Sequence, residues 1–381
     1  MKILLTGAAG FIGSSLARKL IASSNPSKLN TQNSKLKAFV RYNSRADIGL
    51  LSLLPKHELD QIDLVLGDLR DPSAILEAAT GCDLIYHLGA LISIPYSYLH
   101  PVETVQTNIL GTLNILEAAR QLNIPLVHTS TSEVYGTALR VPIDETHPLQ
   151  GQSPYSASKI GADKLVESYY RSFNVPTITV RPFNTYGPGQ SARAVIPTII
   201  TQALTQDHLN LGSLDTKRDF TYIDDTVSGF ILAGQSLLQA TDSSSKLNPQ
   251  PSTLNPQSST LNPQSSTLNT QSSKLNSRQP SAVSGQLLGQ EFNLGTGTEV
   301  TIGQVTETIL RILNKPNLPI RQDPTRLRPT NSEVLRLLSD NRKAKEHLNW
   351  TPTIELEEGL TRTIAWISDH LDRYRIGTYE R

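Results

Sequence analysis

The chain has 381 residues, and its 35 Lys and Arg against 34 Asp and Glu leave a net charge of +1. At about 100–200 residues per domain, this length corresponds to two domains or to one large domain with additions. A net charge near zero gives no reason to expect binding to nucleic acid or to an acidic membrane surface. The single cysteine, Cys82, excludes a disulfide framework and a cysteine-based zinc site.

Targeting and membrane signals are also missing from the sequence. No apolar run approaches the roughly 18 residues that a membrane-spanning helix needs. The N-terminus is too glycine-rich for the apolar core of a signal peptide. We therefore expect a cytoplasmic protein without a metal site.

One segment, residues 241–283, differs in composition from the rest of the chain. Its Ser, Thr, Asn, Gln and Pro residues surround leucines that recur with a period of seven. A coiled coil is excluded, because each heptad has one apolar residue instead of two and prolines interrupt it. Such a composition cannot bury enough surface to offset the entropy of ordering, so we predict a disordered insertion. A fragment of the same repeat predicts a second insertion at about 24–36.

The remaining sequence alternates short apolar strands with amphipathic helices. Strands are predicted at 2–7, 36–41, 63–68, 83–90, 125–131 and 177–184, and helices at 11–22, 102–121 and 155–172. Near-continuous apolar strands between such helices indicate a parallel sheet that is covered on both faces. The predicted fold class is α/β, with a doubly wound, Rossmann-like sheet in residues 1–185. Residues 186–381 are predicted to form mainly a smaller, mixed substrate domain, with segments that return to the sheet.

The first predicted strand runs into a glycine-rich turn, Gly7 to Gly13, that opens the first helix. Glycines at this spacing let the backbone approach a pyrophosphate at the helix N-terminus, which predicts a dinucleotide site. The acid that commonly ends the second strand is missing, and Arg41 stands there. An acid favours NAD and an arginine accommodates the 2′-phosphate of NADP, so both cofactors stay open. Asp68, after the third strand, is predicted to bond the adenine or to cap the strand end.

Tyr155 and Lys159 stand four residues apart on a predicted helix and therefore share one of its faces. An ammonium beside a phenol lowers the phenol's pKa from about 10 toward the working pH. A phenolate base can take the proton from an alcohol while hydride leaves the same carbon. This pair therefore predicts alcohol oxidation beside a nicotinamide cofactor.

The strand that precedes this helix ends in TSTSEVYG, residues 129–136. Thr131 can hydrogen-bond the reacting hydroxyl. Oxidation and epimerisation need no carboxylate at this place, whereas elimination of water needs a base for a carbon-bound proton. Glu133 therefore indicates elimination, unless it only caps a turn.

The motifs GxxGxxG, GDL, TSTSEVYG, YSASK and RPFNTYGPGQ stand in the order of the extended short-chain dehydrogenase/reductases. The chain resembles their nucleotide-sugar epimerase/dehydratase group. Segments 91–98, 147–165 and 181–200 look like NAD-dependent 4,6-dehydratases of nucleotide-activated N-acetylglucosamine, in particular those of legionaminic-type nonulosonic acid synthesis. The dTDP-glucose dehydratases carry Asp where this chain has Ser132, which argues against dTDP-glucose as substrate. GDP-mannose dehydratases resemble the TSE arrangement found here.

The resemblance implies a retaining 4,6-dehydratase that converts UDP-N-acetylglucosamine, or its GDP form, to the 4-keto-6-deoxy sugar nucleotide. Tyr155 and Lys159 would serve the oxidation of C4, and Thr131 would hold the hydroxyl. Glu133, with Ser132 assisting, would remove the C5 proton and release the 6-hydroxyl as water. The cofactor would return hydride to C6 and not be consumed. The alternatives are a 4-epimerase or UDP-glucuronate decarboxylase of the same family and, more remotely, a non-catalytic NADP-sensing protein.

The resemblance also assigns binding residues. The cofactor contacts would be Gly7, Gly10, Phe11, Ile12, Gly13, Arg41, Asp68, Leu69, Leu88, Gly89, Ala90, Tyr155 and Lys159. The substrate contacts would be Asn184, Arg193, Val195, Ile196, Pro197 and Arg218, with Arg326 and Arg328 as further phosphate ligands. Asn108 would support an active-site loop or be a buried structural residue. Family members usually dimerise through a four-helix bundle, so we expect a homodimer built on the helices at 102–121 and 155–172.

Overall fold

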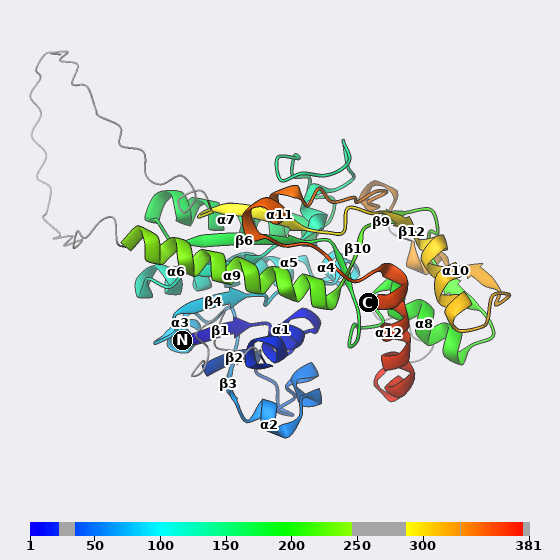
Figure 1. Ribbon diagram of the computed structural model, residues 1–381, viewed down its shortest axis with the longest axis horizontal. Coiled ribbons are helices and arrows are strands. Elements are labelled where there is room, and N and C mark those ends of the chain that lie inside the picture. Colours follow the sequence, from blue (N-terminus) through cyan, green and yellow to red (C-terminus); the bar gives the residue numbers. More distant parts are fainter. Residues whose placement is uncertain (23–34, 246–286, 328, 376–381) are drawn as a thin grey trace, which may run out of the picture.

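The computed structural model describes residues 1–22, 35–245, 287–327 and 329–375 (Figure 1). Most of both predicted insertions and Arg328 lie outside these residues, so their predicted properties stay predictions. The described edges shorten both insertions, because a strand already begins at Lys35 and a helix continues through residues 241–245. Within the described ranges, no helix is long and apolar enough to cross a membrane, and no group of three or more acidic, His or Cys side chains could hold a metal ion.

A seven-stranded parallel sheet forms the centre of the protein, in the order β11-β6-β5-β4-β1-β2-β3. The strands are β1 (Lys2–Thr6), β2 (Lys35–Arg41), β3 (Ile62–Gly67), β4 (Leu84–His87), β5 (Leu126–Thr129), β6 (Thr177–Pro182) and β11 (Gln290–Leu294). The chain winds outward from β1 in both directions, which confirms the predicted doubly wound α/β class. All carboxyl ends meet at one edge, where the predicted site residues follow the strands.

Helices cover both faces of the sheet (Figure 1). On one face, α1 (Phe11–Ala22) packs against α9 (Ile223–Ser245), and α9 also contacts the central strands. On the other face, α6 (Gly111–Leu122) packs between α3 (Pro72–Ala79) and α7 (Pro154–Phe173). Each face has its own buried apolar cluster. Burial on both faces explains why most of these strands are continuous apolar runs, while the edge strand β3 is largely exposed.

The helix predicted at 102–121 is interrupted in the structure. It consists of α5 (Pro101–Val105), a π-helical turn at Gln106–Leu110 and α6. A π-helical turn adds a residue to the turn, so the apolar positions on its two sides no longer share one stripe. Val105 and Leu110 are exposed, whereas Leu116 on α6 is buried. The prediction of one continuous amphipathic helix at 102–121 is therefore wrong.

The rest of the chain adjoins the carboxyl edge of the sheet as a smaller mixed layer of helices and short paired strands (Figure 1). Its helices are α8 (Val195–Thr205), α10 (Ile302–Ile312) and α12 (Leu356–Asp369), which pack against one another. Its strands are β7 (Asn184–Tyr186), β8 (Leu209–Leu211), β9 (Lys217–Arg218), β10 (Phe220–Tyr222), β12 (Val300–Thr301) and β13 (Ile320–Gln322). Short elements complete the described chain, namely α2 (Lys56–Leu59), α4 (Ile94–Leu99) and α11 (Arg342–Leu348).

The two long ranges that the structure does not describe, residues 23–34 and 246–286, are each preceded by a helix and followed by a strand of the sheet. The first separates the end of α1 at Ala22 from the start of β2 at Lys35, and the second separates the end of α9 at Ser245 from residue 287, shortly before β11. In a parallel sheet, a helix that ends and a strand that begins meet at the amino edge. Both gaps therefore open on the edge opposite to the predicted site.

Candidate functional site

The glycine turn between β1 and α1 is shaped by contacts with its neighbours. Gly7 has a φ of +72°, and a Cβ there would lie 2.7 Å from the backbone nitrogen of Gly89. A Cβ at Gly13 would lie 2.1 Å from the carbonyl oxygen of Gly7. These two positions need glycine because the turn, the helix and the next strand pack so closely.

Gly10 differs from the other two glycines of the turn. It is exposed, and a Cβ there would meet only the Gly7 oxygen, at 3.3 Å. The protein's own packing therefore does not explain this glycine, which leaves the backbone bare at the N-terminus of α1. Such a bare helix N-terminus is where a dinucleotide pyrophosphate binds in this architecture, so the turn fits the predicted cofactor.

The remaining predicted cofactor residues lie around the turn. The Gly89 nitrogen donates to Thr6 Oγ1 at 3.1 Å, and a Cβ at Gly89 would lie 2.9 Å from Leu69 Cδ1. Leu88 precedes Gly89 just beyond β4, because that strand ends at His87 and not at the predicted residue 90. Predicted residues in the same neighbourhood are Phe11, Ile12 and Ala90, all partly buried. The structure thus brings one wall of the predicted dinucleotide site together.

Arg41 and Asp68 also come together, within a larger charge cluster. Arg41 lies 3.4 Å from Glu103 and 4.0 Å from Asp68, measured between charged atoms. Asp68 accepts two side-chain hydrogen bonds from Arg70, at 2.9 and 2.7 Å, and these hold its pKa below the usual value. The sequence indicated neither Glu103 nor Arg70. The positive charge of Arg41 is therefore balanced by nearby carboxylates.

The predicted catalytic residues lie on α7 and on the turn after β5. Ser153 caps α7 through a reciprocal pair of bonds with Ser156, so the helix begins at Pro154 and holds Tyr155 in its first turn. Tyr155 is buried and is hydrogen-bonded to Thr131. Thr131 Oγ1 accepts a bond at 3.2 Å from the backbone nitrogen of Glu133. The phenol, the threonine and the glutamate therefore form one group, with buried Ser132 between the last two.

Lys159 is buried below this group, and its ammonium donates to the carbonyl oxygen of Thr129 at 2.6 Å. Burial lowers the pKa of Lys159 to about 8, against the opposing charge of Asp163. Burial also raises the pKa of Tyr155, and the charges of Glu133 and Asp163 add to the rise. The sequence predicted a lowered phenol pKa, and the protein's own groups produce the opposite direction, because desolvation outweighs the hydrogen bond with Thr131, which lowers the pKa.

Asn108 connects the loop that follows β4 with helix α7. Its side chain accepts from the Leu91 nitrogen at 2.7 Å and donates to the Leu91 oxygen and to Ser158 Oγ, both at 2.9 Å. Ser158 Oγ in turn donates to the Tyr155 carbonyl at 2.7 Å. The sequence left open whether Asn108 supports a loop or is a buried structural residue. In the structure it is buried within the π-helical turn and also holds the loop against α7.

The predicted substrate residues divide into two sets. Asn184 and Arg218 are close, because the Asn184 nitrogen bonds the carbonyl of Asp219 at 3.1 Å. Asn184 Oδ1 is a buried acceptor with no partner among the described residues, as expected of a ligand contact. Arg218 is buried and pairs with Glu333 at 3.3 Å, an interaction that the sequence did not indicate.

The other predicted substrate residues lie on or near α8 and in the later chain. Arg193 is exposed and bonds Ser191, and Val195 is half-buried at the start of α8. Ile196 is packed into the main apolar core, and Pro197 beside it is also buried. Arg326 lies 3.1 Å from Asp323. In the structure Ile196 serves the core, and the half-buried Val195 is the more accessible of the two side chains.

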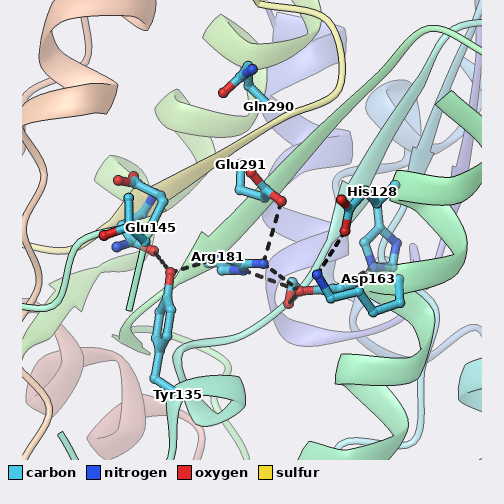
Figure 2. Close-up of polar contacts among 12 residues, drawn as sticks. His128, Tyr135, Glu145, Asp163, Arg181, Gln290 and Glu291 are labelled. Carbon is cyan, nitrogen blue, oxygen red and sulfur yellow. Dashed lines mark hydrogen bonds and ion pairs between the residues drawn. The ribbon is translucent and has the colours of Figure 1, made fainter. Parts of the chain in front are cut away.

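The sequence did not indicate a charge network that joins α7 to the neighbouring strands β6 and β11. Figure 2 shows Arg181 of β6 between Asp163 of α7 and Glu291 of β11, with Tyr135 also in contact. Arg181 donates to Asp163 at 3.0 Å and to the Tyr135 hydroxyl at 3.0 Å. Asp163 could have been found from its spacing, since it lies one helical turn after Lys159 on the same face.

Comparisons with known proteins agree with this geometry. The family model described as GDP-mannose 4,6 dehydratase matches residues 4–245, more than half of the chain. A UDP-glucose 4-epimerase of Mycolicibacterium smegmatis is 28% identical over 96% of this chain and 98% of its own, and a dTDP-glucose 4,6-dehydratase of Mycobacterium tuberculosis is 34% identical over 59% and 66%.

A solved structure, DesIV of Streptomyces venezuelae, is a dTDP-glucose 4,6-dehydratase with NAD bound. It has a TM-score of 0.75 at 25% identity and covers 98% of this chain and 99% of its own. The relatives thus differ in reaction and in sugar nucleotide but share the architecture described above. The chain belongs to the GDP-mannose 4,6-dehydratase family, within the nucleotide-sugar epimerases and dehydratases of the extended short-chain dehydrogenase/reductases.

Proposed function

We propose that the protein is an NAD-dependent 4,6-dehydratase that converts UDP-N-acetylglucosamine, or its GDP form, to the 4-keto-6-deoxy sugar nucleotide. The observation that carries the proposal is Glu133, a carboxylate in the same short turn as Thr131, which bonds Tyr155. An alcohol oxidation at C4 needs the phenol and the lysine, and elimination needs a base as well. The choice of N-acetylglucosamine is supported by the resemblance of segments 91–98, 147–165 and 181–200.

The proposed roles follow from the contacts of each side chain. Tyr155 takes the proton of the 4-hydroxyl, which Thr131 orients, and the Lys159 ammonium stabilises the phenolate that forms. Glu133 removes the C5 proton once C4 is a ketone, and with Ser132 it protonates the departing 6-hydroxyl. When hydride returns to C6, Glu133 returns a proton to C5, and the proton released from the 4-hydroxyl replaces the one that left with the water. NAD, held by the glycine turn and by Leu88 to Ala90, supplies the hydride acceptor and donor when bound.

NAD is the proposed cofactor because of the charges around Arg41. Glu103 and Asp68 both lie within 4.0 Å of its guanidinium. Asp68 is also paired with Arg70, so two arginines and two carboxylates already neutralise one another, and the 2′-phosphate of NADP would have to displace these ion pairs to bind Arg41. The 2′-hydroxyl of NAD carries no charge and leaves the ion pairs intact. The presence of NAD in the related DesIV structure agrees with this choice.

The test is a comparison of the wild-type protein with Glu133→Gln on UDP-N-acetylglucosamine, without added NAD. Mass spectrometry should show loss of one water from the sugar nucleotide with the wild type. We expect the variant to lose this activity by about 100-fold to 10,000-fold, the usual contribution of a general base. Reduction of the bound nicotinamide on substrate addition should persist, because Tyr155 and Lys159 are unchanged.

Glu299→Gln is the matched control, since Glu299 is an acid that pairs with Arg336 in the smaller layer. It should dehydrate the substrate at the wild-type rate. If the wild type leaves both UDP- and GDP-N-acetylglucosamine intact in mass but inverts C4, the protein is a 4-epimerase. Loss of carbon dioxide from UDP-glucuronate would instead identify a decarboxylase.

We also propose that two copies associate through α4, α5 and the π-helical turn. Four apolar side chains on these neighbouring elements are more than two-fifths exposed, namely Leu99 (59%), Val102 (67%), Val105 (42%) and Leu110 (48%). Apolar side chains gathered in this way on a surface are typical of an interface. The expected state is a homodimer, as the resemblance implies.

Val105→Glu should convert the dimer to a monomer, because it places a charge in the apolar contact. Light scattering coupled to size-exclusion chromatography measures the mass directly. Leu335→Glu changes a leucine in the smaller layer that is even more exposed than Val105, and it should leave the dimer intact. A wild-type protein that elutes as a monomer would contradict the proposed interface.

A further inference from the structure

We propose that Asp163 is a positioning residue, which together with Arg181 clamps the end of β5 to the catalytic helix and so fixes Thr131 relative to Tyr155. Nothing in the sequence motifs assigned a role to either residue. The proposal deepens the proposed function, on which its activity measurements rest. Its structural and electrostatic parts concern the protein alone.

The clamp consists of contacts from one carboxylate to two different strands. Asp163 Oδ2 accepts from Ser130 Oγ at 2.8 Å and from Arg181 Nη2 and Nε at 3.0 and 3.2 Å. Asp163 Oδ1 lies 3.3 Å from Nε2 of His128. All four side chains are at most 5% exposed, so water does not compete for these bonds. Ser130 directly precedes Thr131, so the clamp acts on the residue next to the site.

Lys159 makes a second contact between the same face of α7 and the end of β5. Its ammonium bonds the carbonyl of Thr129, the residue between His128 and Ser130, which Asp163 contacts. Three consecutive residues, His128 to Ser130, are therefore bound by two side chains one helical turn apart. The strand itself ends at Thr129, and the last backbone bond to β6 is the one that the Ser130 nitrogen donates to the Val180 carbonyl at 2.7 Å. Beyond that bond, the position of Thr131 against Tyr155 depends on the two side-chain contacts.

Arg181 keeps the carboxylate charged in this buried place. Burial alone would raise the pKa of Asp163, but the hydrogen bond from His128 and the charge of Arg181 lower it to about 2. Burial and the charge of Lys159 lower the pKa of His128 to about 4, so the imidazole is neutral at working pH and donates from Nε2. Arg181 is itself held by Glu291 at 3.9 Å and by Tyr135 (Figure 2).

The same carboxylate acts on the charge of Lys159. The titratable groups that face Lys159 are Asp163 on α7, His87 on β4 and His128 on β5, with Arg181 of β6 paired to Asp163. Both histidines have pKa values lowered by burial and are neutral at working pH. Asp163 thus opposes the burial of Lys159, whose pKa is about 8 with this support. Removing the carboxylate should lower that pKa further.

The first test is Asp163→Asn, followed by the pH dependence of dehydration. We expect the alkaline limb of kcat to move down by about one pH unit, with KM changed less than about twofold, since a unit charge nearby shifts a pKa by this order. Asp163→Glu should recover part of the wild-type profile. Glu167→Gln is the control, because it removes a carboxylate of the same helix that pairs with Lys164 and Arg171 instead of Arg181, and it should keep the profile.

A second variant covers the case in which Asp163→Asn does not fold, since it leaves Arg181 buried without its main partner. The double variant Asp163→Asn/Arg181→Met removes both charges and should regain thermal stability while keeping the shifted pH profile. A profile that returns to wild type together with stability would show that the pair serves folding alone and would overturn the proposal.

Titration of Lys159 by NMR of labelled lysine separates this proposal from the function, because it needs no substrate. Lys159→Met assigns the signal. A lowered Lys159 pKa in Asp163→Asn supports the electrostatic role of Asp163 even if the wild type dehydrates no sugar nucleotide, in which case only the proposed function fails. An unchanged Lys159 pKa in a folded variant overturns the electrostatic role whatever the enzyme does.

Discussion

Replacing Tyr155 with phenylalanine is expected to slow hydride exchange between sugar and cofactor by about 1,000-fold, within the usual range for an acid–base group. The substitution removes only the hydroxyl, which bonds Thr131, and leaves the buried ring in place. Single-turnover measurement of nicotinamide reduction on addition of the sugar nucleotide gives the rate. The melting temperature should stay close to that of the wild type, because one partly compensated hydrogen bond is lost.

Tyr135→Phe is the matched control for this prediction. Tyr135 is an equally buried tyrosine whose hydroxyl bonds Asn293 and Arg181. Its loss should reduce stability more than the loss at Tyr155, and it should slow the chemistry far less. A Tyr155→Phe protein that reduces the nicotinamide at the wild-type rate would remove the phenol from the mechanism and leave Lys159 and Thr131 without a base to serve.

Alanine at Gly13 and alanine at Gly10 are expected to fail in different ways. At Gly13 the new Cβ would lie 2.1 Å from the Gly7 oxygen and 2.8 Å from the Gly7 carbonyl carbon, both backbone atoms that cannot move aside. We expect a loss of about 3 kcal/mol in the free energy of unfolding, at the upper end for overpacking. Denaturant unfolding measures it, and dinucleotide binding should fall with it.

At Gly10 the new Cβ would approach only the Gly7 oxygen, at 3.3 Å, so the protein should keep its stability. The methyl group would occupy space at the N-terminus of α1 where the pyrophosphate is expected. Dinucleotide affinity should therefore fall by about 10-fold or more, which corresponds to roughly 1.4 kcal/mol. Calorimetric titration with NAD measures it. Wild-type affinity in the Gly10→Ala protein would place the pyrophosphate elsewhere.

The sheet was predictable because most of its strands are buried on both faces, the edge strand β3 being the exposed exception. Predicted and observed strands agree closely from β1 to β6, and the largest difference is at β4, which ends at His87 three residues before the predicted end. That difference follows from the close approach of Gly7 and Gly89, a tertiary contact. The π-helical turn at residues 106–110 was not predictable, since one extra residue in a turn leaves the local composition unchanged.

The sequence spacing predicted which of the proposed catalytic residues lie together, but it did not predict their electrostatics. Tyr155 and Lys159 are one helical turn apart, so the sequence alone places them together. The direction of the Tyr155 pKa depends on burial, which arises only when α7 packs against the sheet. The ion pairs of Arg41, Arg181 and Arg218 could not be predicted either. Their partners, Glu103, Asp163 and Glu333, are distant in the sequence and are brought to them by the fold.

The place of Ala22 and Ser245 in the fold has a consequence for the use of this protein as a reagent. The chain leaves the described structure after Ala22 and after Ser245, at the edge of the sheet farthest from Tyr155 and Glu133. A label, a fusion partner or a surface linker joined there would be attached at the amino edge of the sheet. The catalytic edge would then face the solution, open to a sugar nucleotide as large as the substrate proposed above.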